Sequence, residues 1–147
     1  MTHRGHSLLV QTGAGNGIGM DDLAYRKAGG KIVSGAAEIF QKAEMIVKVK
    51  EPQPRECKML RPGQILFTYL HLAPDLPQTK ALMKSGCTAI AYETVTDASG
   101  RLPLLAPMSE VAGRMSIKVG AHFLEKTQGG SGILLGGVTG VASASVV

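Results

Sequence analysis

The sequence predicts an α/β protein with an open, mostly parallel sheet, helices on both faces of the sheet, and a long helix after it. Strand-like and helix-like segments alternate through the first 92 residues, which is the pattern of βαβ units. The segment MIVKV at 45–49 is apolar except for Lys48 and is rich in β-branched residues, as in a strand covered on both faces. The chain has 147 residues and 44% hydrophobic content, which suits one domain of ordinary size.

The expected elements follow one another at regular intervals. Strands are expected at 7–12, 31–34, 45–49, 64–70 and 87–92, and helices at 20–28, 36–43 and 75–84. Pro52, Pro54 and Pro62 leave little room for a helix between the third and fourth strands, so Arg55–Leu60 is expected to form only a turn or two. A polar loop at 96–102 then separates these elements from the longest helix.

The longest helix carries one apolar stripe and two glycines. Ser109 is expected to cap its amino terminus. The stripe repeats every four residues, at Val111, Met115, Val119 and Phe123. Gly113 and Gly120 lower the intrinsic helix propensity, so we expect this helix to pack closely against a neighbour.

Lys50 and His71 end two neighbouring apolar runs. Side chains alternate between the two faces of a strand, so Lys48 and Lys50 lie on the same face at the carboxyl end of the strand expected at 45–49. In the same way, His71 continues the row of apolar side chains on one face of the run at 64–73. In an open α/β sheet, ligands bind outside the carboxyl ends of the strands, so both side chains are expected in that zone. Each also has a plain structural interpretation, as a solvated lysine and as a hydrogen-bonded packing histidine.

The glycine-rich segment GAGNGIG at 13–19 follows a strand-like run and precedes a helix-like one, as a dinucleotide-binding turn does. The spacing does not fit, because Ile18 stands where the third small residue is required. The next strand also ends in Ser34 and not in an acidic residue. We therefore interpret this segment as an ordinary glycine-rich turn.

Composition excludes several other classes. Cys57 and Cys87 form neither a metal motif nor a disulfide framework, so we expect a reducing, cytoplasmic setting and no metal. No apolar run approaches the length of a membrane helix. The net charge of +5 is spread along the chain without basic residues clustered among aromatic ones, which disfavours nucleic-acid binding.

Five segments resemble the amino-terminal part of bacterial alanine dehydrogenase, in the same order and almost from end to end. They are KVKEP at 48–52, GQILFTYLHLA at 63–73, AIAYETV at 89–95, LPLLAPMSEVAGRM at 102–115 and QGGSGILLGGV at 128–138. The NAD-binding subunit of proton-translocating transhydrogenase shares the fold, but FTYLHLA with its histidine is not expected there. The resemblance thus favours alanine dehydrogenase.

The resemblance implies a flavodoxin- or Rossmann-like substrate domain and a reversible, NAD-dependent conversion of L-alanine to pyruvate and ammonia. It assigns substrate binding to Lys50 and general acid/base catalysis to His71. Ser109 and Met108 match positions that touch the nicotinamide cofactor. It also implies a homo-oligomer.

The resemblance further implies three regions: a substrate domain at 1–107, an interdomain helix at 108–127, and the start of an NAD-binding domain at 128–147. The family has an earlier strand and helix with a substrate-binding arginine, and later a Rossmann turn and a catalytic aspartate. We therefore expect a chain truncated at both ends and inactive alone. Two alternatives stay open: half of a split enzyme completed by a separate NAD-binding polypeptide, and a non-catalytic small-ligand or interaction module.

Overall fold

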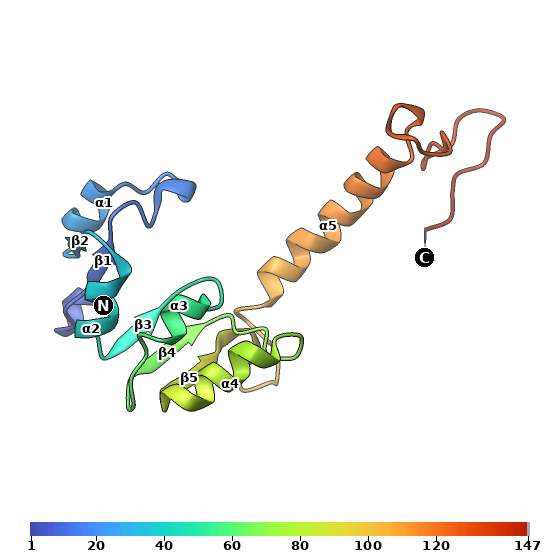
Figure 1. The fold of residues 1–147 in the computed structure, drawn as a ribbon. Coiled ribbons are helices and arrows are strands. Elements are labelled where there is room, and N and C mark those ends of the chain that lie inside the picture. The colour runs from blue at the N-terminus through green and yellow to red at the C-terminus, as the bar shows by residue number, and fades with distance from the viewer. Residues whose placement is uncertain (147) are drawn as a thin grey trace. The chain divides into compact units, whose positions relative to one another are not determined.

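The computed structural model describes residues 1–146 and divides the chain into two compact units, Met1–Thr94 and Val95–Val147. The first unit holds all five strands and four of the α-helices (Figure 1). The strands are parallel, so the predicted α/β class is confirmed. They divide between two sheets, a two-stranded one and a three-stranded one.

The two-stranded sheet pairs β1 (Leu9–Gln11) with β2 (Lys31–Val33). Between these strands the chain forms a short 3₁₀ turn, η2 (Asn16–Ile18), and α1 (Asp22–Lys27). Asp21 begins α1, because its carboxylate accepts a hydrogen bond from the Ala24 N–H at 2.8 Å. A similar turn, η1 (Thr2–Arg4), precedes β1.

The three-stranded sheet has the order β3 (Met45–Val47), β4 (Ile65–Thr68) and β5 (Thr88–Ala91). The connections are α2 (Ala36–Lys42) from β2 to β3, α3 (Pro54–Cys57) from β3 to β4, and α4 (Leu76–Ser85) from β4 to β5. Asp75 caps the start of α4, and Gly86 ends this helix with a positive φ of 68°. Each strand is shorter than predicted at one or both ends.

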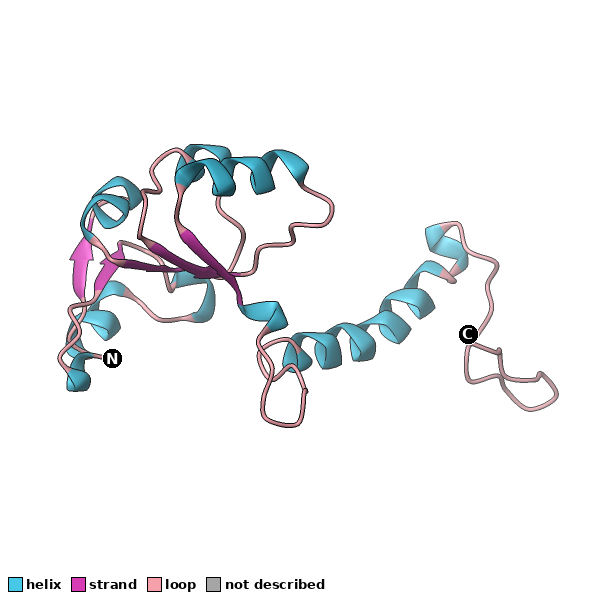
Figure 2. Ribbon diagram, turned by 90° about the horizontal axis from the view of Figure 1, so that it is seen from below, coloured by secondary structure: helices cyan, strands magenta, loops and turns pink. Residues whose placement is uncertain are grey.

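One face of the three-stranded sheet holds the core. Leu66 of β4 is fully buried and packs with Ile46 of β3 and with apolar side chains of α2, α3 and α4. Figure 2 shows helices lying along one side of these strands. The buried Gln64 amide donates to the carbonyl oxygens of Phe40 and Ala43, at 2.9 and 2.7 Å, and so ties the end of α2 to β4. The helices thus fix the strands, and the strands fix the positions of the loops that follow them.

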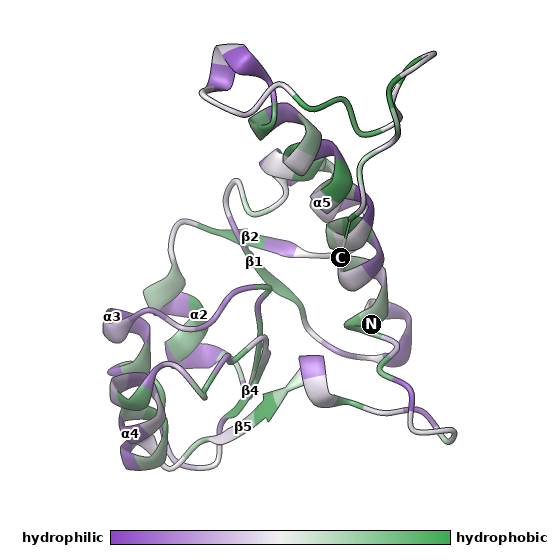
Figure 3. Ribbon diagram, turned by 90° about the vertical axis from the view of Figure 1, so that its right-hand side faces the viewer, coloured by the Kyte–Doolittle hydropathy of each residue, from purple (hydrophilic) through white to green (hydrophobic). Residues whose placement is uncertain are grey.

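In the second unit, α5 (Ala106–Phe123) precedes a 3₁₀ turn, η4 (Lys126–Gln128). The expectation that Ser109 caps this helix is wrong, since α5 begins three residues earlier, after Leu105. Pro107 lies in the first turn, where its fixed φ and missing N–H suit a helix start. Apolar residues recur along the helix (Figure 3), and those of the predicted stripe are exposed. Apart from the adjoining residues and backbone of α5 itself, no atom of the described residues would lie within 4 Å of a Cβ at Gly113 or Gly120, so the expected close neighbour is not found among them.

Candidate active site at the carboxyl ends of β3 and β4

The segment that follows β3 is hydrogen-bonded to the end of β4. The Lys48 N–H donates to the Phe67 carbonyl at 3.1 Å, and the Tyr69 N–H donates to the Val49 carbonyl at 3.3 Å. The buried Thr68 hydroxyl donates to the Lys50 carbonyl at 2.8 Å. These bonds hold the backbone of Lys50 beside the residues that lead to His71. The structure therefore brings the two predicted site residues to the same edge of the sheet.

The two lysines that follow β3 have different surroundings. Lys48 is partly buried, and its ammonium group pairs with the carboxylate of Glu56, which also accepts the Gln53 N–H in a capping box at the start of α3. The Lys50 side chain is 73% exposed, and its Nζ lies 3.9 Å from Glu51 Oε2, at the limit of an ion pair. Lys48 thus anchors α3, whereas Lys50 is available to an anionic ligand.

His71 has an unusual backbone conformation. Its φ is 45°, and it is the one non-glycine residue among residues 1–146 with a positive φ. This conformation costs an L-residue about 1–2 kcal/mol, so surrounding contacts must stabilise it. Its ring stacks on Tyr69, with centroids 5.6 Å apart and planes 16° from parallel, and Tyr69 meets Tyr92 edge to face at 4.4 Å. His71 is an exposed residue, so its side chain is accessible to solvent or to a ligand.

Glu93 is a site residue that the sequence reasoning missed. It lies in η3 (Tyr92–Thr94), directly after β5. Its Oε1 accepts hydrogen bonds from the N–H groups of Leu70 and His71, both at 3.0 Å, and its Oε2 lies 3.2 Å from the Leu70 nitrogen. Burial raises the pKa of Glu93, but the backbone N–H groups of His71, of Glu93 itself and of Leu70, together with the electrostatic effect of His71, outweigh burial, and the pKa lies below its ordinary value. A signal was present in AIAYETV, because this glutamate follows the strand next to β4 at the same sheet edge.

Tyr92 ties the same turn to the segment that carries Lys50. Its hydroxyl donates to the Val49 carbonyl at 3.0 Å, and its ring also packs against Phe67, with centroids 5.0 Å apart. Tyr92 and Glu93, the first two residues of η3, therefore contact the segments that carry both predicted site residues. Tyr92 holds the backbone just before Lys50, and Glu93 holds the backbone of His71.

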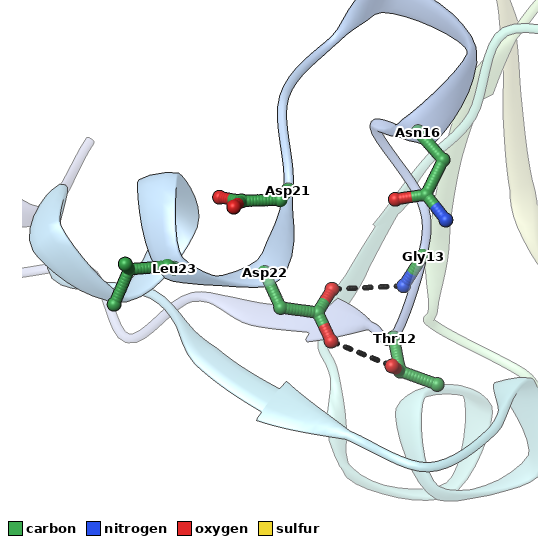
Figure 4. Close-up of a pocket in the computed structure, with 6 residues that line it drawn as sticks. All are labelled: Thr12, Gly13, Asn16, Asp21, Asp22 and Leu23. Atoms are coloured by element: carbon green, nitrogen blue, oxygen red, sulfur yellow. Dashed lines mark hydrogen bonds between the residues drawn. The ribbon is translucent and has the colours of Figure 1, made fainter.

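The glycine-rich turn at 13–19 forms a separate surface pocket of about 270 Å³ (Figure 4). Asp22 fills the place where a phosphate would have to bind, because its carboxylate accepts the Thr12 hydroxyl at 2.6 Å and the Gly13 N–H at 2.8 Å. The Thr12 hydroxyl, and then the Gly13 N–H, lower the pKa of Asp22, so it is negatively charged at neutral pH. With Asp21 beside it, the pocket would repel a pyrophosphate. The structure supports the interpretation of an ordinary turn.

Met108 and Ser109, the predicted cofactor contacts, lie in the first turn of α5 and are exposed. They belong to the second compact unit, whereas Lys50 and His71 belong to the first. Their role stays a prediction.

Residues 1–146 contain no group of three or more histidine, cysteine, aspartate or glutamate residues arranged to hold a metal ion. None of the helices in this part of the chain is both long and apolar enough to cross a bilayer.

The fold and this edge define a class of α/β domain whose ligand-facing side chains lie beyond the carboxyl ends of parallel strands. Within that class, the chain belongs to the alanine dehydrogenase/PNT family. The family model described as "Alanine dehydrogenase/PNT, N-terminal domain" matches residues 1–112.

Curated relatives support the same assignment. The chain is 54% identical over its whole length to an alanine dehydrogenase of Mycolicibacterium smegmatis, and covers 40% of that protein. It is 56% identical to the alanine dehydrogenase of Halomonas elongata, with 97% of this chain and 38% of the relative covered. The chain therefore spans about two fifths of the length of the curated relatives it matches.

Solved structures separate the two branches of the family. A structure of L-alanine dehydrogenase matches 97% of this chain and 39% of its own, with a TM-score of 0.82 and 50% identity. A transhydrogenase from Sinorhizobium meliloti matches 63% of this chain and 27% of its own, with a TM-score of 0.57 and 28% identity. The chain is thus more similar to the alanine dehydrogenase than to this transhydrogenase.

Proposed function

We propose that this chain is the substrate-binding part of an NAD-dependent L-alanine dehydrogenase. The observation that carries the proposal is the placement of Lys50 and His71 at one edge, beyond the carboxyl ends of β3 and β4, by the Thr68 and Tyr69 hydrogen bonds. The reaction converts L-alanine, NAD⁺ and water to pyruvate, ammonium, NADH and a proton, and it runs in both directions.

Lys50 is the proposed partner of the substrate carboxylate or of the neighbouring carbonyl oxygen. Its exposed ammonium group offers a positive charge and three donors to a small anion. Lys48 is unsuited to this role, because its charge is already paired with Glu56.

His71 is the proposed general acid/base. Loss of a hydride from the alanine Cα leaves an imine, which water attacks to give a carbinolamine that then releases ammonia. Protons must leave the attacking water and reach the departing nitrogen, and an imidazole exchanges protons in the neutral range. The exposed ring of His71, supported on the face of Tyr69, can present a nitrogen to this chemistry.

NAD is the proposed cofactor, and it supplies the hydride acceptor. The residues of the glycine-rich turn do not fit its pyrophosphate, because Asp22 already accepts the Gly13 N–H. The proposed contribution of this chain to cofactor binding is therefore limited to Met108 and Ser109. A homo-oligomer and a cytoplasmic setting belong to the same proposal, whereas a separate NAD-binding polypeptide belongs to the alternative of a split enzyme.

The test is alanine-dependent NADH formation by the purified chain, alone and mixed with a separately expressed family cofactor domain. A ¹H–¹⁵N NMR titration with pyruvate runs in parallel. We expect turnover in the mixture, and pyruvate-dependent shifts at Lys50 and His71. Lys50→Gln should abolish those shifts, whereas Lys84→Gln should not, because Lys84 is an exposed lysine in α4 just before β5, at the opposite edge of the sheet.

The outcomes separate the possibilities. Pyruvate binding without turnover in any mixture would favour a non-catalytic small-ligand module. Activity of the chain alone would require a cofactor site in this chain, such as the glycine-rich turn at 13–19, which Asp22 makes unsuitable for a pyrophosphate. A folded chain with neither binding nor turnover would refute the proposal.

A further inference from the structure

We propose that Glu93 is the positioning residue for His71: it holds the backbone of the general acid/base in its left-handed conformation at the end of β4. This inference rests on the proposed function for its catalytic meaning, and on the geometry of η3 for the positioning itself.

The strained residue is bonded directly to Glu93. The N–H groups of Leu70 and His71 both donate to a single carboxylate oxygen, Glu93 Oε1, and the positive φ of His71 is the rotation about the bond that starts at the second of these two nitrogens. Two successive backbone donors around one anion form the kind of concave anion site that such backbone conformations favour. Glu93 is therefore bonded to the strained residue itself and to the residue before it.

The negative charge of Glu93 strengthens its hydrogen bonds to the backbone. Hydrogen bonds to an ionised acceptor are roughly twice as strong as neutral ones. Burial alone would raise the pKa of Glu93, but its hydrogen bonds lower the pKa below the ordinary glutamate value, so Glu93 is ionised at neutral pH. Glu93 thus accepts a charge-assisted hydrogen bond from the His71 backbone.

Glu93 leaves the His71 imidazole, the proposed catalytic group, available to the substrate. It contacts the His71 main chain, while Tyr69 supports one face of the imidazole ring. The nitrogens at the edge of the ring are left for substrate. Because Tyr92 in the same turn is bonded to Val49, η3 also sets the backbone of His71 relative to the segment that carries Lys50.

The experiment compares the chain with Glu93→Ala, Glu93→Asp and Glu93→Gln. Backbone NMR shifts of Leu70 and His71 report the conformation of the strained segment. Turnover in the mixture with a cofactor domain reports catalysis. Glu93→Gln is the conservative variant, since one side-chain oxygen can still accept both N–H groups without the charge. The shorter Glu93→Asp keeps the charge but cannot reach both donors.

The matched control is Asp97→Asn. Asp97 is another carboxylate that organises a loop, accepting the N–H groups of Ser99 and Arg101 at 2.9 and 3.0 Å, but it lies in the second unit and contacts no histidine in the described part of the chain. It reports the effect of losing a loop-forming carboxylate in general.

We expect Glu93→Ala and Glu93→Asp to remove the positive-φ signature of His71 and to lower kcat at least tenfold with a smaller change in KM. We expect Glu93→Gln to restore the signature and most of the rate. Asp97→Asn should leave both unchanged. An unchanged His71 signature in folded Glu93→Ala, or an unchanged kcat, would overturn the proposal.

Failure of the proposed function gives a different result. A wild-type chain with no pyruvate response and no turnover in the mixture refutes the alanine dehydrogenase role. The His71 backbone signature still decides, in the same variants, whether Glu93 positions this residue.

Discussion

Replacing Thr68 with valine tests how Lys50 is held at the sheet edge. Thr68 is fully buried, and its hydroxyl donates to the Lys50 carbonyl at 2.8 Å. Valine has nearly the same shape, so the substitution removes the donor without opening a cavity. Loss of such a bond costs about 0.5–1.5 kcal/mol, and about 1–3 kcal/mol if the acceptor stays buried and unpaired. Because this hydrogen bond is only partly buried, we expect a cost of about 1 kcal/mol.

The assay is urea and thermal unfolding followed by circular dichroism. For a unit of this size, each kcal/mol corresponds to a fall in Tm of about 4–8 °C. Thr68→Ser is the control, since it keeps the hydroxyl and loses only a methyl group. In NMR titrations, pyruvate should bind Thr68→Val more weakly than Thr68→Ser, because Lys50 is then less fixed. If Thr68→Val matched the wild type in both stability and pyruvate affinity, the hydrogen bond would not be positioning Lys50.

Three further predictions concern the core, the thiols and acid stability. Leu66→Ala should lower the unfolding free energy by about 2–5 kcal/mol, because Leu66 is fully buried, and a loss below 1 kcal/mol in urea unfolding would contradict its central place in the core. Cys87 should react with a maleimide before Cys57, because Cys57 is buried and burial raises the pKa of its thiol. Mass spectrometry of the folded chain measures both rates, and equal rates would contradict this order. The pKa of Glu93 is lowered in the folded state, so its contribution to stability is present above the ordinary glutamate pKa of about 4.3 and is lost as the pH falls through the lowered value. Acid unfolding of Glu93→Gln should therefore depend less on pH in that range, and an unchanged slope would argue against an ionised Glu93.

The sequence was sufficient to predict which strands lead to Lys50 and His71, the residues of the candidate site. The apolar runs before Lys50 and His71 are local signals, and parallel strands bring their carboxyl ends to one edge whatever the details of packing. The position of Lys50 beside β4 follows from that rule. The hydrogen bond between the Thr68 hydroxyl and the Lys50 carbonyl, which fixes the backbone of Lys50 more closely, does not follow from it.

Other features depend on contacts between distant residues, which a local pattern does not contain. Glu93 meets His71 across 22 positions of sequence, and a left-handed φ at a non-glycine residue such as His71 requires stabilising contacts of this kind. The alternation of side chains along the strand placed Lys48 and Lys50 on the same face and made them equal candidates for ligand binding. The pairing of Lys48 with Glu56 in the structure distinguishes them. The start of α5 was misplaced because a serine is a strong capping signal, whereas Pro107 in the first turn set the boundary.

The division into two sheets has a consequence for local unfolding. β1 and β2 form a two-stranded sheet, and such a pair is marginally stable in water by itself. It is linked to the larger core through α2, whose carboxyl end is held by Gln64 and by the Arg61 guanidinium on the Ala43 carbonyl. Amide hydrogens of β1 and β2 should then exchange with solvent through a partial opening of lower free energy than the one that exposes β4. Such an opening would leave the Lys50–His71 edge intact, so the ligand site and the amino-terminal strands would behave as separate cooperative units.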